Sequence, residues 1–332
     1  MCSDVVVREL RDADLPAVAV LLRTEWPDVD WEHRFARQWR NAPTVAGARP
    51  PRGFVHADRD AIRGFFGSIP IPYQVDGRAG LACIATALCV HPAARGHGVA
   101  TALVAAFDTQ RADAKVNSTP NAASAPLFAR AGYASIDPAA GRHLLAHAEQ
   151  PFGVLRKAWR AHKRGMVQSL LQVAPRAPEP ALTCARLDAA TAELDTLWQT
   201  HRGTHPTTLW RDRTTLQWLL FADPRCTVIG CRDGTGALRG YGACREERGE
   251  LRQIDLFPAC DDDVSFALGL ASASLAAGRG IATVRLLSVS APAARALQSH
   301  GFEPADDDLT IQVRGIDSHH AWLTRIDGDR WL

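Results

Sequence analysis

A short glycine-containing turn between a strand-like and a helix-like segment restricts the fold of this chain more than any other sequence feature. The run Leu81–Val90 is apolar enough for a buried strand, residues 91–100 form the turn, and residues 101–112 have helical spacing. Such a turn exposes backbone N–H groups at a helix start, where the helix dipole adds partial positive charge. Glycine lets the backbone approach a phosphate closely, and Arg95 can donate further hydrogen bonds. The turn therefore predicts a diphosphate ligand.

Two common phosphate-binding motifs can be excluded at this turn. The dinucleotide fingerprint requires a third glycine where this chain has Thr101, and phosphate-loop NTPases require Gly-Lys-Ser/Thr, which is absent. What remains is the run Arg-Gly-His-Gly-Val-Ala at residues 95–100. This run resembles motif A of the GCN5-related N-acetyltransferases, in which the loop holds the pyrophosphate of coenzyme A.

The resemblance implies two sets of backbone groups that bind an acyl-coenzyme A. The pantetheine arm is expected to pair with Leu88, Cys89 and Val90. The pyrophosphate is expected at the amide groups of Arg95, Gly96, His97, Gly98, Val99, Ala100 and Thr101. The implied cosubstrate is acetyl-coenzyme A or another acyl-coenzyme A. The implied reaction is direct attack of an amine on the thioester within a ternary complex.

The other elements of the first half follow the order of the acetyltransferase fold. Before the turn, the sequence predicts a strand, two helices and three strands, at residues 5–10, 12–23, 31–40, 53–57, 62–75 and 81–90. A strand at 114–117 and a helix at 122–131 follow the helix after the turn. Asn121, which opens the last helix, and Gly132-Tyr133, which close it, resemble motif B of the family. We therefore expect an α/β fold with a mixed sheet.

The sequence defines the proton-transfer residues less clearly. Many family members carry a tyrosine general acid four residues before the closing Gly-Phe/Tyr, but this chain has Phe128, which donates no proton and is expected only to border the donor. Asn121 either contacts the pantetheine arm or a water, or it caps the helix. Candidate general bases are Glu25, between the first two helices, and Tyr73, near the end of a strand.

Asp255, in the second half of the chain, is a third candidate base. It lies within the apolar run Gln253–Leu256, and a carboxylate in such surroundings can have a raised pKa. The alternative is an ion pair with Arg211 or Arg213. Proton transfer through ordered water would need none of these residues.

The second half repeats the element order of the first half without its glycine turn. Helices and strands are predicted in the same succession between residues 194 and 299, closing at Gly301-Phe302. At the place of the turn the chain has Asp261-Asp262-Asp263, which would repel a pyrophosphate by about 1 kcal/mol or more per close pair. The alternative role of these carboxylates is to cap a helix. We therefore expect a degenerate copy that does not bind coenzyme A.

Length and composition suit two globular domains. The chain has 332 residues, 46% of them hydrophobic and 22% charged, with a net charge of +2, so each half can bury a core and nucleic acid is not expected as a partner. We predict an acyltransferase domain at residues 1–148, a basic amphipathic helix with a proline-rich linker at 149–182, and the degenerate domain with a C-terminal tail at 183–332. The eight cysteines and twelve histidines show no metal-binding spacing, so no metal is expected. No apolar run reaches about 18 residues, so no transmembrane segment is expected. The sequence also shows no signal peptide, so we expect a cytoplasmic protein.

Three functions are compatible with these observations. The first is acyl transfer, in its simplest form acetyl transfer, to the amine of a small molecule. In the second, the basic helix at 151–173 docks an acyl carrier protein or an anionic membrane and the acyl chain is longer, although this helix can equally be a solvated bridge. The third is a regulatory protein that binds coenzyme A without catalysis, because Phe128 replaces the usual tyrosine. The sequence indicates no oligomeric state.

Overall fold

A computed structural model describes residues 5–43, 50–58, 61–136, 143–148, 182–305, 310–317 and 321–328. Contacts divide the chain into two compact units. The first unit combines Met1–Ala140 with Ala189–Asp223 and Asp308–Leu332, and the second combines Gly141–Asp188 with Pro224–Asp307. Each unit is therefore assembled from segments that are far apart in the sequence. The predicted basic helix at 151–173 and its linker lie outside the described residues.

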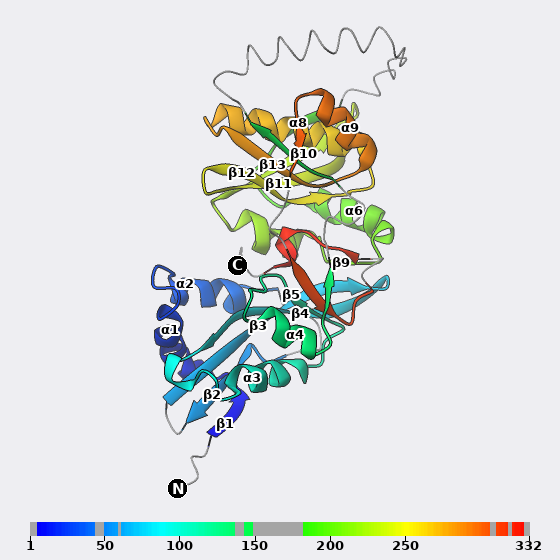
Figure 1. Cartoon of the computed structure of the whole chain (residues 1–332). Coiled ribbons are helices and arrows are strands. Elements are labelled where there is room, and N and C mark those ends of the chain that lie inside the picture. Colours follow the sequence, from blue (N-terminus) through cyan, green and yellow to red (C-terminus); the bar gives the residue numbers. More distant parts are fainter. Residues whose placement is uncertain are drawn as a thin grey trace. The chain divides into compact units, whose positions relative to one another are not determined.

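A mixed sheet forms the centre of the first unit (Figure 1). Its main strand order is β1-β2-β3-β4-β5-β15-β6, in which β4 and β5 are parallel. The strands are β1 (Val5–Glu9), β2 (Gly53–Asp58), β3 (Ala61–Val75), β4 (Arg78–Val90), β5 (Ala114–Asn117), β6 (Ala134–Ile136) and β15 (Ile311–Arg314). Two short strands extend the sheet beside β3: β9 (Thr207–Leu209) pairs with β3, and β16 (Ala321–Trp322) pairs with β9.

Helices cover both faces of this sheet. One face packs against α1 (Leu15–Arg23) and α2 (Trp31–Phe35), and the other against α3 (Val99–Asp108) and α4 (Ala125–Arg130). Successive strand residues point to opposite faces, so Phe65 belongs to the first core and Phe66 to the second. The predicted helix at 31–40 is divided, because α2 continues as a π-helical turn over Ala36–Arg40.

The segment 189–223 of the first unit contains two further helices. They are α6 (Ala192–His201) and α7 (Arg213–Leu216), and α7 continues as a π-helical turn over Gln217–Phe221. The indole N–H of Trp218 donates to the Arg37 carbonyl at 2.8 Å, and Arg37 pairs with the buried Asp223 at 3.3 Å. This segment is therefore held to the region that follows α2 by buried polar contacts.

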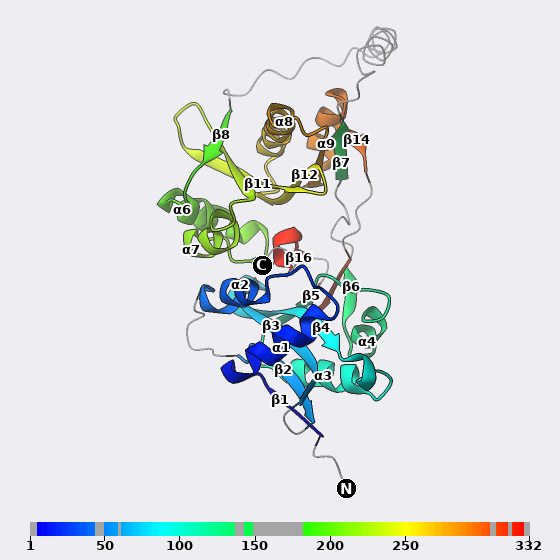
Figure 2. The same cartoon turned by 90° about the vertical axis from the view of Figure 1, so that its left-hand side faces the viewer.

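The second unit contains a mixed sheet of its own (Figure 2). Its order is β14-β7-β13-β12-β11-β10-β8, in which β12 and β13 are parallel. The strands are β7 (His143–Ala148), β8 (Thr183–Leu187), β10 (Cys226–Arg232), β11 (Leu238–Glu247), β12 (Glu250–Phe257), β13 (Thr283–Val289) and β14 (Glu303–Pro304). Helices α8 (Asp262–Gly278) and α9 (Ala291–Ser299) pack against this sheet around one apolar core.

The two sheets have equivalent strand orders with one strand exchanged between them. Each sheet begins with several antiparallel strands and continues through one parallel pair of strands. The next strand in each sheet comes from a distant part of the chain, and we call it the inserted strand. In the first sheet the inserted strand is β15, from the C-terminal part of the chain, and in the second it is β7, from the N-terminal half. The expected α/β fold with mixed sheets is confirmed. The predicted domain boundaries did not include this exchange, and the repeat with a degenerate second copy stays a prediction.

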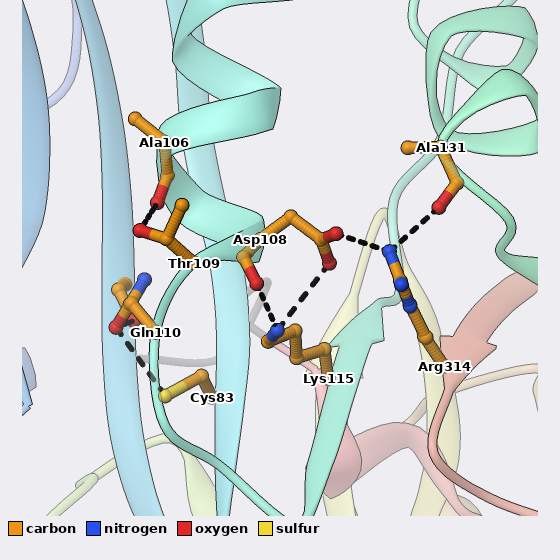
Figure 3. A network of polar contacts seen from close by, with 9 residues as sticks. Cys83, Ala106, Asp108, Thr109, Gln110, Lys115, Ala131 and Arg314 are labelled. Atoms are coloured by element: carbon orange, nitrogen blue, oxygen red, sulfur yellow. Dashed lines mark hydrogen bonds and ion pairs between the residues drawn. The ribbon is translucent and has the colours of Figure 1, made fainter.

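Polar contacts fasten the inserted strand β15 to the helices of the first unit (Figure 3). The Arg314 guanidinium pairs with the Asp108 carboxylate at the end of α3 and donates to the Ala131 carbonyl after α4 at 2.8 Å. The Lys115 ammonium lies 3.3 Å from the same carboxylate. Cations at helix C-termini satisfy the last carbonyls and interact favourably with the helix dipole.

Among the described residues, no helix is long and apolar enough to cross a membrane.

Candidate active site

The strands β4 and β5 pair over only part of their length. Ala82, Cys83 and Ile84 of β4 face Ala114–Val116 of β5, and β5 ends one residue later at Asn117, whereas β4 continues to Val90. A bulge lies just beyond the paired part, where Ala87 has a φ of 50° and the register with β3 shifts. The far half of β4 therefore has a backbone edge that β5 does not cover, which is available to a ligand.

A cavity of about 320 Å³ opens at this point of the first unit, and we call it the β4–β5 cavity. One wall consists of residues 85–88 of β4, and a second consists of Asn117 and Thr119 at the end of β5. Residues of α4 and its start, the ring of Phe66, and three side chains of the α1–α2 region complete the lining: Asn121, Ser124, Phe128, Phe66, Trp26, Trp31 and Arg34. Among the described residues of this lining, only Arg34 carries a charge.

The glycine turn leads from β4 into α3. Gly96 and Gly98 have φ values of 82° and 79°, which an L-residue rarely adopts, and Gly98 directly precedes the first residue of α3. Within the described part of the chain, the amide groups of residues 96–101 have no hydrogen-bond acceptor. Arg95 is held beside the turn, because its Nε donates to the Val90 carbonyl at 3.1 Å and its guanidinium pairs with Glu25. The turn thus presents a set of donors at a helix N-terminus.

Two residues predicted from motif B line the cavity. Asn121 precedes the turn at residues 122–124 that leads into α4, and its side-chain oxygen accepts from the amides of Ala123 at 3.0 Å and Ser124 at 2.9 Å. Phe128 is buried and makes edge contacts with the rings of Phe66 and Tyr133 at centroid distances of 5.8 and 5.1 Å. The residue that directly precedes α4 is Ser124, which makes no side-chain cap hydrogen bond, so Asn121 caps the preceding turn rather than α4 itself, and it also borders the cavity.

The exchanged strand β15 makes hydrogen bonds that position a side chain of the cavity lining. Gln312 of β15 accepts a hydrogen bond from the Asn117 side chain at 3.2 Å and donates to the Ala125 carbonyl at 3.1 Å. Gln312 and Asn117 are both buried, so the contacts are shielded from water. A residue near the C-terminus of the chain thereby fixes the orientation of a cavity-lining side chain.

Comparisons with known proteins agree with this geometry. Residues 50–135, which span β2 to β6, match the family model of the acetyltransferase (GNAT) domain. This match assigns an acetyltransferase (GNAT) domain to residues 50–135. The domain supports acyltransferase chemistry in general, and no curated protein sequence matches the chain significantly.

Solved structures show the same fold at low sequence identity. A probable N-acyltransferase of unknown function from Enterococcus faecalis V583 is 12% identical with a TM-score of 0.59, and the match covers 93% of this chain and 72% of that one. GCN5-related N-acetyltransferases from Kribbella flavida and Anabaena variabilis are each 15% identical, with TM-scores of 0.58 and 0.59. These matches cover 94% of this chain and 72% and 73% of the other chains. The similarity therefore extends well beyond the GNAT domain matched by sequence.

The three candidate bases make different polar contacts. Glu25 pairs with Arg95, so its carboxylate holds the glycine turn. Tyr73 is fully buried and donates to Asp327 at 2.8 Å, and burial together with the Asp327 charge raises the pKa of Tyr73 well above its usual value. Asp255 is buried in the second unit and accepts a hydrogen bond from the Tyr241 hydroxyl at 2.6 Å. Each of the three has a different partner, and their catalytic roles stay predictions.

Thiols near the GNAT site are protonated at neutral pH. Burial raises the pKa of Cys83 and of Cys89 to about 11, and the Glu25 charge contributes to the rise at Cys89. A thiol rather than a thiolate is a poor nucleophile. Neither cysteine is among the described residues that line the β4–β5 cavity.

The equivalent position in the second unit contains carboxylates in place of the glycine turn. Asp261 caps α8 by accepting from the Val264 amide at 3.1 Å, and it pairs with Arg239 at 3.2 Å. Ser290 caps α9 by accepting from the Ala293 amide at 3.3 Å. The α8 N-terminus is thus already capped by a protein carboxylate, which satisfies the donor that an anion would need.

Neutralising this acidic run is therefore expected to leave donor affinity unchanged. In the triple variant Asp261→Asn, Asp262→Asn and Asp263→Asn, the cap persists because asparagine caps helices as well as aspartate does. Calorimetric titration with acetyl-coenzyme A should give a dissociation constant within about twofold of the wild-type value. A tenfold or larger loss would place the donor site in the second unit.

Sequence reasoning missed the α1–α2 wall of the cavity. The pattern over residues 31–40 predicts only a helix, and it does not distinguish Trp31 or Arg34 as parts of a site. Aromatic residues at four-residue spacing, as Trp31, Phe35 and Trp39 are, are typical of a helix face that packs in a core. Trp26 lies between the first two predicted helices, and only that position could have indicated this wall.

Proposed function

We propose that this protein transfers an acyl group, in the simplest case acetyl, from coenzyme A to the amine of a small molecule. One observation carries the proposal: residues 85–88 on the uncovered part of β4 line the cavity, and the amide donors of the glycine turn follow at the end of the same strand. The turn would bind the diphosphate, and the β4 edge at Leu88–Val90 would pair with the amide groups of the pantetheine arm. The thioester would then enter the β4–β5 cavity beside the bulge at Ala87.

The proposed mechanism is direct attack within a ternary complex. Holding the thioester and the amine side by side converts a bimolecular step into an effectively unimolecular one. The amine nitrogen forms the new amide bond, the carbon–sulfur bond breaks, and the coenzyme A thiolate leaves. Side-chain hydroxyl and amide groups of Ser124, Thr119 and Asn117 border the cavity and can hold a water that accepts the proton lost by the amine nitrogen and passes a proton to the sulfur.

The pH dependence of kcat/KM should reflect the ionisation of the acceptor amine rather than that of an enzyme residue. No described residue of the cavity lining titrates between about pH 5 and 9, because the lining consists of aromatic, aliphatic, hydroxyl and amide side chains and Arg34. The amine must be neutral to attack, so kcat/KM should rise about tenfold per pH unit until the pKa of the free amine. When kcat/KM is plotted against pH for two amines of different pKa, the two curves should level off at different pH values, each near the pKa of its amine. If both curves levelled off at the same pH, an ionising residue of the enzyme would be acting as the base.

A thiol-release screen tests the proposed activity. The purified protein is incubated with acetyl-coenzyme A and pooled small amines, and free thiol is measured against a no-acceptor control. Amine-dependent release supports the proposal. Tight binding of acetyl-coenzyme A without release from any amine would instead support the regulatory alternative. Turnover with an acyl carrier protein alone would support the second alternative.

A further inference from the structure

We infer that the side-chain oxygen of Asn117 accepts a hydrogen bond from the acceptor amine and thereby selects primary amines over their N-methyl derivatives. The inference rests on the proposed function, since it concerns the acceptor of the same cavity. It is carried by a chain of hydrogen bonds that fixes which end of the Asn117 amide the protein uses and which end it leaves to a ligand.

This chain of hydrogen bonds starts at a backbone carbonyl. The Ala125 carbonyl of α4 can only accept, so the Gln312 atom that lies 3.1 Å from it is the Nε2 donor. The other end of the Gln312 amide is then the Oε1 acceptor, which lies 3.2 Å from the Asn117 side chain. The Asn117 atom that faces it is therefore the Nδ2 donor. A group that cannot exchange donor and acceptor thus sets the orientation of both amides.

The Oδ1 atom of Asn117 is the acceptor that this arrangement leaves unused. It receives no hydrogen bond from the described residues, and it is not one of their enclosed polar atoms that lack a partner. Asn117 lines the β4–β5 cavity and is 5% exposed. A ligand in the cavity can therefore donate to Oδ1, and the buried surroundings strengthen such a hydrogen bond.

The chemistry of acyl transfer makes this hydrogen bond selective. A neutral primary amine has two N–H groups and one lone pair. As its nitrogen forms the amide bond and the carbon–sulfur bond breaks, one proton leaves to the water proposed above, and the other N–H can stay bonded to Oδ1. An N-methyl amine has a single N–H, which must leave, so its nitrogen loses this bond on the way to product. Oδ1 has two lone pairs and can bind the amine and the water together.

The other lining residues indicate the body of the acceptor. Most of them are aromatic or aliphatic, and the rings of Trp26, Trp31 and Phe66 are among them. Such a lining favours an apolar ligand with few polar groups. Phenethylamine, an aromatic ring joined to a primary amine, has this chemistry and serves as the first probe.

Matched pairs of amines test the inference. Phenethylamine is compared with N-methylphenethylamine, and hexylamine with N-methylhexylamine, each with saturating acetyl-coenzyme A, and kcat/KM is measured from thiol release. We expect the wild-type protein to prefer the primary amine. Asn117→Leu, which has a similar shape without the amide, should lower the primary to N-methyl ratio about tenfold, the usual effect of one hydrogen bond. Its affinity for acetyl-coenzyme A should be unchanged.

Gln312→Met and Gln74→Met form a matched pair of variants. Gln312→Met keeps Asn117 but releases its amide, so the ratio should also fall. Gln74 is another buried amide of the first unit, which donates to the Arg202 and His205 carbonyls at 2.9 Å, and it is not among the cavity-lining residues. Gln74→Met should therefore keep the wild-type ratio.

Two results would overturn the inference. The first is a wild-type ratio that neither Asn117→Leu nor Gln312→Met changes. The second is a loss of acetyl-coenzyme A affinity in Asn117→Leu with an unchanged circular dichroism spectrum, which would show that Oδ1 binds the donor. If Asn117→Leu does not fold, the comparison of Gln312→Met with Gln74→Met decides.

Calorimetry with the product amides separates this inference from the proposed function. N-phenethylacetamide has one N–H, its N-methyl derivative has none, and both are uncharged. Each is titrated into the protein saturated with coenzyme A, which needs no turnover. About tenfold tighter binding of the first amide, lost in Asn117→Leu, would support the inference even if no acyl transfer were found. Equal or absent binding of both amides would overturn it, while amine-dependent thiol release would leave the proposed function standing.

Discussion

Gly98→Asp is expected to abolish coenzyme A binding while leaving the fold intact. The added carboxylate would lie at the N-terminus of α3, beside the proposed diphosphate, and two like charges about 4 Å apart repel by about 4 kcal/mol near a protein surface. This corresponds to roughly a thousandfold loss of affinity. A Cβ at Gly98 meets no atom within 4 Å, so the substitution causes no clash. Calorimetric titration with acetyl-coenzyme A measures the loss.

Gly249→Asp is the matched control for this prediction. Gly249 lies in the turn between β11 and β12, has a φ of 76°, and a Cβ there also meets no atom within 4 Å. The variant thus carries the same added charge and the same backbone strain of about 1–2 kcal/mol at a place remote from the glycine turn in the sequence. Its donor affinity should equal that of the wild type. If Gly98→Asp bound acetyl-coenzyme A as tightly as Gly249→Asp, the motif assignment would be wrong.

Asp327→Ala should cause the largest loss of stability, about 3–5 kcal/mol. Asp327 is completely buried, accepts the Tyr73 hydroxyl at 2.8 Å and the Thr324 amide at 2.7 Å, and lies 3.9 Å from the buried Arg211 guanidinium. Removing the carboxylate leaves a buried positive charge without its partner, and such losses have this magnitude. Typical domains are stable by only about 5–15 kcal/mol. Urea unfolding followed by circular dichroism should show the change.

Asp12→Ala provides the comparison for the buried carboxylate. Asp12 also belongs to the first unit and pairs with Arg52, but its side chain is 78% exposed. Exposed ion pairs contribute about 0–1 kcal/mol, so this variant should be nearly as stable as the wild type. Equal effects of Asp12→Ala and Asp327→Ala would show that the Tyr73–Asp327–Arg211 contacts do not hold the C-terminal segment in place.

Local sequence patterns predicted most elements of the fold. The strand predicted at 114–117 has those bounds, and the strand predicted at 62–75 extends over Ala61–Val75. The glycine turn and the following helix were also predicted, because glycines at positive φ and a helix start are features of a few adjacent residues. The π-helical turn after α2 was not predicted, since its residues have the same spacing as an α-helix.

The strand exchange and the α1–α2 wall could not be predicted in this way. β15 has the sequence Ile-Gln-Val-Arg, which specifies an alternating strand but not the sheet that it joins. Gln312 is therefore paired with Asn117 only because β15 enters beside β5. Similarly, Tyr73 was a candidate base from its place near a strand end, whereas its hydroxyl is enclosed with Asp327, a residue from the other end of the chain.

The sequence by itself determined the glycine turn, the succession of helices and strands, and the resemblance to the acetyltransferases, because each depends on residues close together along the chain. Only the tertiary structure decided which sheet receives β7 and β15, which side chains enclose the β4–β5 cavity, and that Arg34 is the charge within it. The physical reason is that pairing partners and burial depend on contacts between distant segments, and a strand or an arginine has the same local pattern whatever surrounds it.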